Sequence, residues 1–412
     1  MMIELRSDIQ KWIRIAFINL LIVALLGTIM RYKIAYYFPL IEQKNFLHAH
    51  SHFAFAGWVT QVLITMLVAY LSTKTHKNFF KKYKWLLTAN LVTAYGMLLS
   101  FPWEGYGIVS ITFSTLSIFV SYAFAFFFWK DLNRLPAKSV SHLWFKAALI
   151  FNIISSIGAF ALAYMLANKM QHPSWYLATI YYFLHFQYNG WFFFTCMGLL
   201  CSKLVTAGVK QLFLKRIFLM FVLACVPTYF LSALWLPIPF IVYLLVVLAA
   251  ALQLIGWIFL LIKIIKFRAA IFATVLKDAK IILILSGIAL SIKLLLQAGS
   301  TIPYLSKIAF GFRPVVIGYL HLVLLGVITL FIIGYSKMNN FIFTNRIGNS
   351  GIIIFISGII LNEIFLMIQG VSYMSYINVP WINELLLGAA ICMLCGVSLL
   401  NLGLIKRNYT YG

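Results

Sequence analysis

Acidic residues, and charged residues in general, are scarce in this 412-residue sequence. The chain has 8 Asp and Glu, and charged residues make up 10% of it, against 63% hydrophobic residues. A soluble domain typically has about 25% charged and about 45–50% apolar residues. So few charges could not cover so much apolar area, which excludes a soluble globule. With 5 cysteines and 10 prolines, the composition also excludes a disulfide scaffold and a collagen-like or disordered chain.

Long hydrophobic runs instead occupy nearly the whole chain. A spanning helix needs about 20 mostly apolar residues, and the Leu236-Pro237-Ile238-Pro239 break separates two runs because proline interrupts helices. The twelve runs are 12–30, 47–72, 83–102, 106–129, 143–166, 175–201, 215–235, 238–262, 279–299, 313–335, 350–370 and 381–404. They predict an all-α polytopic membrane protein with about 12 transmembrane helices. We expect one integral membrane domain, residues 1–412, without a cleaved signal peptide.

The excess of basic residues predicts the orientation of these helices. The chain has 32 Lys and Arg and a formal charge of +24. On the twelve runs, 25 of these residues fall on the side of the termini, 6 fall on the other side, and Lys293 lies inside a run. Cytoplasmic loops are the basic ones. We therefore expect the inner (cytoplasmic) membrane of a bacterium, cytoplasmic termini, contact with the lipid bilayer and its anionic lipids, and no nucleic-acid partner.

Five of the eight histidines lie in the expected helices. His48, His50 and His52 begin the second helix, His185 lies in the sixth and His321 in the tenth. All three helices run from the outer face inward, which puts the five histidines in the outer half of the bilayer. The separations, 135 residues from His50 to His185 and 136 to His321, suggest a pseudo-threefold arrangement of four-helix groups. His48 and His52 share a helix face, while His50 points elsewhere.

The chemistry of imidazole suggests what these histidines could bind. Neutral imidazole is a ligand for haem iron and copper, and an apolar helix-lined site sets the redox potential. The five histidines therefore predict haem or metal ligation. The structural alternative is that each one hydrogen-bonds a neighbouring backbone or hydroxyl group. The loop residues His76, His142 and His172 are expected to be solvated.

Three segments and the topology resemble the haem–copper oxidase superfamily, which includes oxidase subunit I, bacterial nitric oxide reductases and the NnrS-like membrane proteins. The segments are His48-Ala-His-Ser-His-Phe-Ala-Phe-Ala-Gly-Trp58, Phe183-Leu-His-Phe-Gln-Tyr-Asn-Gly-Trp191 and Tyr319-Leu-His-Leu-Val-Leu-Leu-Gly326. The resemblance implies a haem, b-type because no covalent attachment motif is present. Its ligand would come from His48, His50 or His52, with His321 as the helix-10 ligand. It also implies that His185, with His48 and His52, belongs to a site for copper or another metal.

The chain also departs from this pattern. Tyr319 and Val323 stand where a second helix-10 histidine would be, and the seventh run has no histidine. We therefore expect an incomplete copper site in a haem-binding protein linked to oxygen, nitric oxide or metal chemistry, and leave open whether it is an oxidoreductase. Its partners would be other respiratory-chain or metal-handling membrane subunits. The alternatives are a transporter for a metal ion or haem and a non-catalytic membrane subunit.

Other polar residues in or near the membrane are candidates for supporting roles. Lys293 and Glu363 lie in mid-helix, where an unpaired charge is costly; they predict either a proton or ion path or a clasp between helices. Glu104 is a candidate for proton entry or for a partner of the site. Arg31 and Arg313 could bind haem propionates, because arginine matches carboxylates, or serve only as interfacial residues. We expect Cys392 and Cys395 to be two small buried residues.

Overall fold

The structure, a computed structural model, describes residues 2–170 and 172–405. The basic residues Lys406 and Arg407, which contribute to the expected orientation of the C-terminus, lie outside this part. Within the described residues the chain is helical, and no β-strand forms apart from an isolated bridge between Thr344 and Leu404. This confirms the expected all-α class. The chain divides into two compact units, residues 1–135 with 335–412, and residues 136–334.

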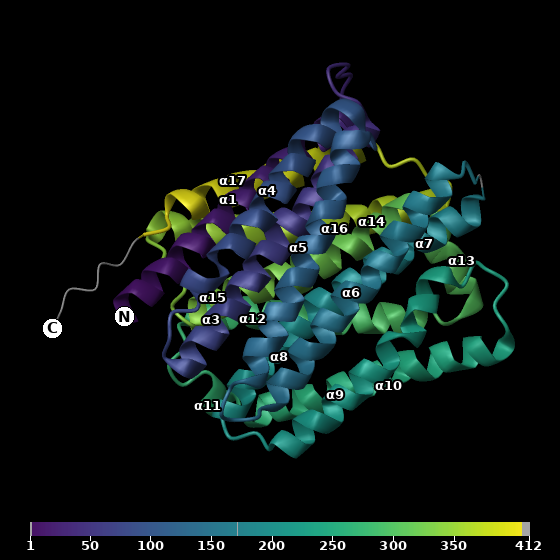
Figure 1. The fold of residues 1–412 in the computed structure, drawn as a ribbon. Coiled ribbons are helices and arrows are strands. Elements are labelled where there is room, and N and C mark those ends of the chain that lie inside the picture. Colours follow the sequence, from purple (N-terminus) through teal and green to yellow (C-terminus); the bar gives the residue numbers. More distant parts are fainter. Residues whose placement is uncertain (1, 171, 406–412) are drawn as a thin grey trace. The chain divides into compact units, whose positions relative to one another are not determined.

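The first unit holds the helices nearest both ends of the chain. They are α1 (Met2–Ala35), α2 (Gln43–His52), η1 (Phe53–Thr60), α3 (Gln61–Thr75), α4 (Phe80–Glu104), α5 (Ile108–Asn133), α16 (Arg346–Met374) and α17 (Ile382–Leu402). The segments α2, η1 and α3 follow one another without a break. Helix α1 packs along α17, and α4 packs along α5 (Figure 1).

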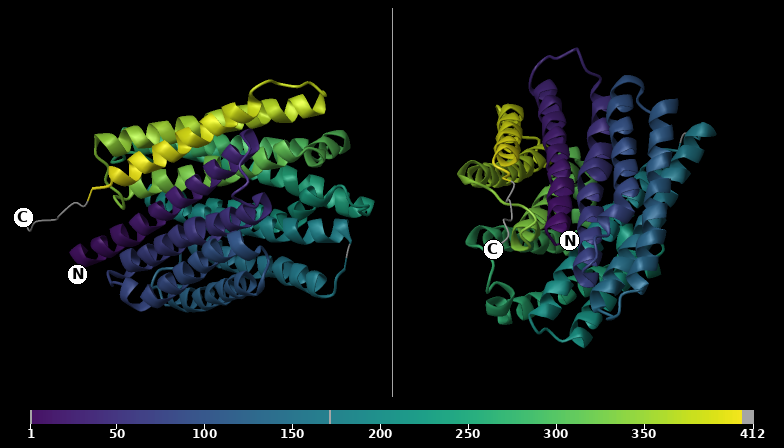
Figure 2. Two further views of the ribbon diagram at one scale, coloured as in Figure 1. Left: turned by 90° about the horizontal axis from the view of Figure 1, so that it is seen from above. Right: turned by 60° about the vertical axis from the view of Figure 1, so that its left-hand side comes forward.

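Closely spaced glycines hold α16 against α17 in this unit. Gly351 and Gly358 on α16 are seven residues apart, as are Gly396 on α17 and Gly403 directly after its end. A Cβ atom on Gly396 would fall on the backbone nitrogen of Phe355, and one on Gly351 would fall on that of Leu400. Small residues allow such close backbone contact between membrane helices. Figure 2 shows the pair as two antiparallel ribbons from green to yellow.

The second unit holds the middle of the chain. Its segments are α6 (Val140–Ala167), α7 (Pro173–His185), η2 (Phe186–Phe192), α8 (Phe193–Thr206), α9 (Gln211–Cys225), η3 (Pro227–Ala233), α10 (Phe240–Lys266), α11 (Arg268–Ile271), α12 (Lys277–Gly299), α13 (Pro303–Gly311), α14 (Arg313–His321) and η4 (Leu322–Thr329). Helix α15 (Leu330–Met338) continues η4 across the boundary into the first unit.

Ten of the described helices are long and apolar enough to cross a membrane, and the pair α9 and η3 makes up to eleven. The run expected as one helix over 215–235 bends by 42° at Pro227, because a proline inside a helix removes a hydrogen bond and clashes with the turn before it. The run 175–201 is helical, as α7, η2 and α8, but it is not among the ten. Its Tyr, Trp, His, Gln and Asn residues lower its mean hydropathy. The polytopic helical architecture is confirmed; the count of twelve is not.

Candidate functional site

Among the residues that the structure describes, three segments are π-helical, and each begins directly after one of the five histidines of the expected membrane helices. Segment η1 follows His52, η2 follows His185 and η4 follows His321. The π-helix is rare in proteins, and where it occurs it often lies at a functional site. The structure therefore marks the same three histidine-bearing helices that the sequence marks, by a property of the backbone that the histidine spacing does not contain.

A short sequence motif accompanies each π-helical segment. A glycine follows each histidine after four residues, as His52 and Gly57, His185 and Gly190, and His321 and Gly326; in the first two cases a tryptophan comes next. The 135-residue and 136-residue separations start from His50, whereas this motif starts from His52, so those separations do not reveal it. Of the three clustered histidines, the motif selects His52 as the counterpart of His185 and His321.

Buried polar side chains from neighbouring helices bind backbone carbonyls of these segments. In the first unit, Asn19 of α1 donates to the Gly57 carbonyl at 2.5 Å and Asn90 of α4 donates to the Ala56 carbonyl at 3.0 Å. In the second unit, Ser286 of α12 donates to the Val327 carbonyl at 2.8 Å. A π-helical turn leaves some carbonyls without the usual i+4 donor. These side chains supply donors and so fix the rotation of η1 and η4.

Removing one of these donors should loosen η1. In Asn19→Leu the Gly57 carbonyl and the Tyr95 hydroxyl, which donates to Asn19 Oδ1 at 2.8 Å, both lose their partner. A buried polar group without a partner costs about 1–3 kcal/mol. We expect a lower thermal unfolding temperature in detergent and faster amide exchange across residues 53–60. Asn168→Leu is the control, since Asn168 is exposed and its side chain donates to the Tyr164 carbonyl one turn earlier, at the end of α6. Equal effects of the two changes would contradict the role of Asn19.

The side chain of His50 faces helix α1, whereas those of His48 and His52 face α4. Its Nδ1 donates to the Val23 carbonyl at 3.1 Å, and its ring lies so close to α1 that a Cβ atom on Gly27 would be 3.3 Å from His50 Cε1. Arg31 lies one turn beyond Gly27 on the same face of α1. The expectation that His50 points away from His48 and His52 is therefore confirmed. Arg31 is the basic residue of α1 that lies one helical turn from the contact between His50 and Gly27.

His48 and His52 lie together against the end of α4. The His52 ring stacks on Phe101 with centroids 4.5 Å apart, and His52 Nε2 makes a long 3.4 Å hydrogen bond with the Tyr106 hydroxyl. The His48 ring lies 4.5 Å from the Tyr106 ring. His48 Nε2 is buried and has no hydrogen-bond partner among the described residues. The first unit thus holds two adjacent imidazoles in an aromatic surrounding, one of them with an unused ring nitrogen.

His185 is hydrogen-bonded at both ring nitrogens in the second unit. It is 1% exposed; its Nε2 donates to the Cys225 carbonyl at 2.8 Å, and its Nδ1 accepts from Asn189 Nδ2 at 3.1 Å. The Cys225 carbonyl is accessible because the Tyr229 amide turns to Val226 after the bend at Pro227. His185 therefore has the arrangement expected of a structural histidine that hydrogen-bonds neighbouring groups. A metal at either ring nitrogen would have to displace one of these two hydrogen bonds.

His321 makes its hydrogen bond within its own helix. Its Nδ1 donates to the Ile317 carbonyl at 2.8 Å. Tyr319, two residues before it, contacts Tyr188 of η2 with ring centroids 6.3 Å apart, so the π-helical segments that follow His185 and His321 lie near each other inside this unit. Arg313, at the start of α14, is exposed.

A buried polar cluster surrounds His185. Thr228 donates to the Cys225 carbonyl at 3.1 Å, and Gln253 Nε2 donates to Thr228 Oγ1 at 3.4 Å. Lys293 is 5% exposed, and its ammonium lies 5.7 Å from the Phe193 ring centroid. Together these contacts join α7, α9, η3 and α10, and place Lys293 of α12 beside the start of α8.

The packing of α10 on α12 sets the level of Lys293 in this cluster. Trp257 donates to Ser291 and Tyr243 to the Thr301 carbonyl, each at 2.9 Å. This antiparallel register puts Gln253 level with Lys293. Among the described residues, buried amide oxygens of Gln253, Gln297 and Asn189 lack a donor. Such a group of unsatisfied oxygens is suited to internal water or a small ligand.

The two predicted acidic groups have local partners. Glu104 Oε1 accepts from the Ser110 amide at 2.6 Å at the start of α5, where a carboxylate is favoured by the helix dipole. Glu363, half-buried on α16, accepts from Asn362 Nδ2 at 3.2 Å. Both residues are in the first unit, and the structure gives each a local structural contact.

The described residues contain no group of three or more His, Cys, Asp or Glu placed to hold a metal ion. All five cysteines are free thiols, and Cys395 is exposed whereas Cys392 is half-buried. The expectation of two buried cysteines is therefore wrong for Cys395, which lies on a face of α17 that the first unit does not cover.

Comparison with known proteins adds no relative: no family model matches the chain, and no curated protein matches it.

Proposed function

We propose that the chain is a haem-binding integral membrane protein of the haem–copper oxidase type, tied to oxygen or nitric oxide chemistry and without a complete haem–copper centre. One observation carries the proposal: a histidine stands directly before a π-helical segment, and five residues before a glycine, on three separate helices. If these histidines only packed in the core, the same order of histidine, π-helical segment and glycine would not be expected on three helices.

The residues of the first unit fit an axial haem ligand. His48 Nε2 is buried without a partner among the described residues, and His52 Nε2 makes a long hydrogen bond to Tyr106, so a metal at either nitrogen would not have to displace a short hydrogen bond. The flat surroundings of Phe101 and Tyr106 suit a porphyrin edge. Arg31 lies on the α1 face that His50 contacts, and not beside His48 and His52, so this proposal assigns it no propionate. A haem held here would supply one-electron chemistry and a site for a diatomic gas.

A second metal site fits less well. His185 already uses both ring nitrogens, and the second unit has no other histidine apart from His142, His172 and His321. The proposal therefore assigns His185 to orienting η2 through Asn189, and assigns no copper. His321 remains a second candidate for haem ligation. The proposed setting is the bacterial inner membrane with cytoplasmic termini, and the proposed partners are respiratory-chain or metal-handling subunits.

Reduced-minus-oxidised optical spectra of the purified chain, expressed with haem available, test the proposal. We expect a Soret band and a b-type haem that acid acetone extracts, because no covalent attachment motif is present. Haem and copper are to be quantified in the same sample, with copper expected below one atom per chain. A preparation that is folded by circular dichroism and shows no Soret band would overturn the proposal.

An ion transporter is the second candidate, favoured by the buried cluster around Lys293. The second unit has a single acid, Asp278, which lies 15 residues before Lys293, or about 22 Å along the helix. A buried ammonium so far from any carboxylate of its unit is costly unless it is neutral or binds an anion or water. Ion flux into proteoliposomes that Lys293→Met abolishes, in a chain without haem, would favour this candidate.

A further inference from the structure

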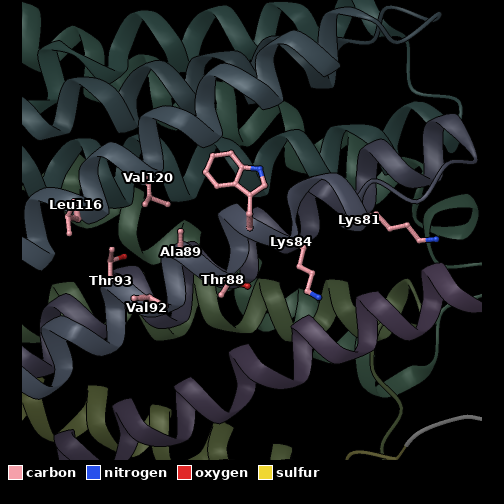
Figure 3. A pocket seen from close by; sticks show the side chains of 9 residues that line it. Lys81, Lys84, Thr88, Ala89, Val92, Thr93, Leu116 and Val120 are labelled. Atoms are coloured by element: carbon pink, nitrogen blue, oxygen red, sulfur yellow. The ribbon is translucent and has the colours of Figure 1, made fainter.

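A groove on the first unit lies between α4 and α5. It has a volume of about 720 Å³ and is lined by Lys81, Lys84, Trp85, Ala89 and Val92 of α4 and by Leu116 of α5, among others. Figure 3 shows the two lysines toward one end of the groove and Leu116 at the other. The groove is therefore polar and basic at one end and apolar along the rest of its length.

The groove is open, and with its basic end it is about as long as one lipid leaflet. Val92 is 57% exposed and Leu116 is 45% exposed. From Lys81 to Val92, α4 rises about 16 Å, which is close to half of the hydrocarbon thickness of about 30 Å. Trp85, 53% exposed, stands next to the lysines and packs edge-on against Phe127. Tryptophan at this level is typical of the membrane interface.

The basic end is placed for an anion. Lys81 and Lys84 lie in the first turns of α4, where the helix dipole disfavours a positive side chain and favours a bound negative group. They belong, with Lys74, Lys77 and Lys82, to a cluster of basic residues on the side expected to be cytoplasmic. Lys81 forms an ion pair of 2.9 Å with Glu4 of α1, and its side chain is 69% exposed. Glu4 therefore competes with any anion for Lys81 but leaves Lys84 to it.

The geometry points to a binding site for one anionic phospholipid, with its phosphate on Lys84 and Lys81 and an acyl chain along Ala89, Val92 and Leu116. Basic pockets between membrane helices on the cytoplasmic side bind acidic lipid headgroups. This occupant matches both ends of the groove, whereas a zwitterionic lipid would gain little from the lysines and a soluble anion would leave the apolar part empty. The site is independent of haem.

Native mass spectrometry of the full chain with phosphatidylglycerol or phosphatidylcholine, added in equal amounts, tests this site. We expect wild type to retain phosphatidylglycerol preferentially and Lys84→Gln to reduce that retention about fivefold, from a contribution of about 1 kcal/mol per lysine near the membrane surface. Glu4→Gln should increase retention, because it releases Lys81 from its ion pair. Ala89→Phe should reduce retention by filling the groove while leaving both lysines in place.

Lys77→Gln is the matched control, since Lys77 is an exposed lysine just before α4 and outside the groove. Retention by this variant should equal that of wild type. Thermal unfolding in lipid-free detergent identifies any variant that is merely misfolded. Equal retention of the two lipids by wild type, equal losses in Lys84→Gln and Lys77→Gln, or unchanged retention in Ala89→Phe would each overturn the site.

Discussion

Replacing His52 by alanine is expected to reduce bound haem by at least about tenfold relative to wild type. The π-helical motif places His52, and not His48 or His50, in the position shared with His185 and His321. An axial imidazole is the protein's bond to the iron in a b-type site, so its loss should remove the haem and not merely shift its spectrum. The measurement is the Soret absorbance per chain after purification.

Three further variants make this result specific. His50→Ala should keep most of the haem, because His50 is occupied with Val23 and packs on Gly27. His48→Ala should lower the haem content by less than His52→Ala. His76→Asn is the control, since His76 caps α3 in a left-handed conformation with φ of 53°, which asparagine tolerates. Loss of haem in His50→Ala with retention in His52→Ala would refute the assignment by motif.

Gly396→Ala is expected to lower the thermal unfolding temperature by roughly 5–10 °C. Its Cβ atom would meet the Phe355 backbone nitrogen, which cannot turn aside as a flexible side chain could. Overpacking of this kind costs about 1–3 kcal/mol or more, and each kcal/mol corresponds to roughly 2–4 °C in a protein of a few hundred residues. The measurement is unfolding of the detergent-solubilised chain followed by circular dichroism.

Gly388→Ala on the same helix supplies the comparison. A Cβ atom on Gly388 would have no neighbour within 4 Å. Alanine is favoured over glycine in a helix by about 1 kcal/mol, so this change should leave the unfolding temperature the same or raise it. Opposite signs for the two changes would show that backbone contact between α16 and α17, and not helix propensity, decides stability here. A decrease of equal size in both would contradict that view.

The bend in the seventh run shows where sequence reasoning succeeded and where it stopped. The Pro237 and Pro239 break was read correctly as the separation of two helices, because two prolines within three residues cannot be absorbed by a helix. Pro227 was passed over as one apolar residue among many, although it bends the run and exposes the Cys225 carbonyl to His185. A single proline inside an apolar run can either be tolerated or redirect a helix, and its neighbours decide which.

His185 makes the same point for the candidate site. Its residue type and position predicted metal ligation, whereas the fold gives both of its ring nitrogens partners on Cys225 and Asn189. Asn189 could have been noticed in the sequence, since it follows His185 by four residues and so shares its helix face. The Cys225 carbonyl could not, since it belongs to another helix and is exposed only by the local bend.

The sequence by itself determined the membrane class, the helical architecture, and the three helices that carry the histidines, because hydropathy and side-chain type act along the chain. The tertiary structure alone decided which hydrogen bonds and ring contacts these imidazoles make. That outcome depends on Asn19 and Asn90 holding η1, on Gly27 admitting His50, and on Phe101 and Tyr106 enclosing His48 and His52. Hydrogen bonds and close packing between helices join residues distant in the chain, and no pattern along the sequence records them.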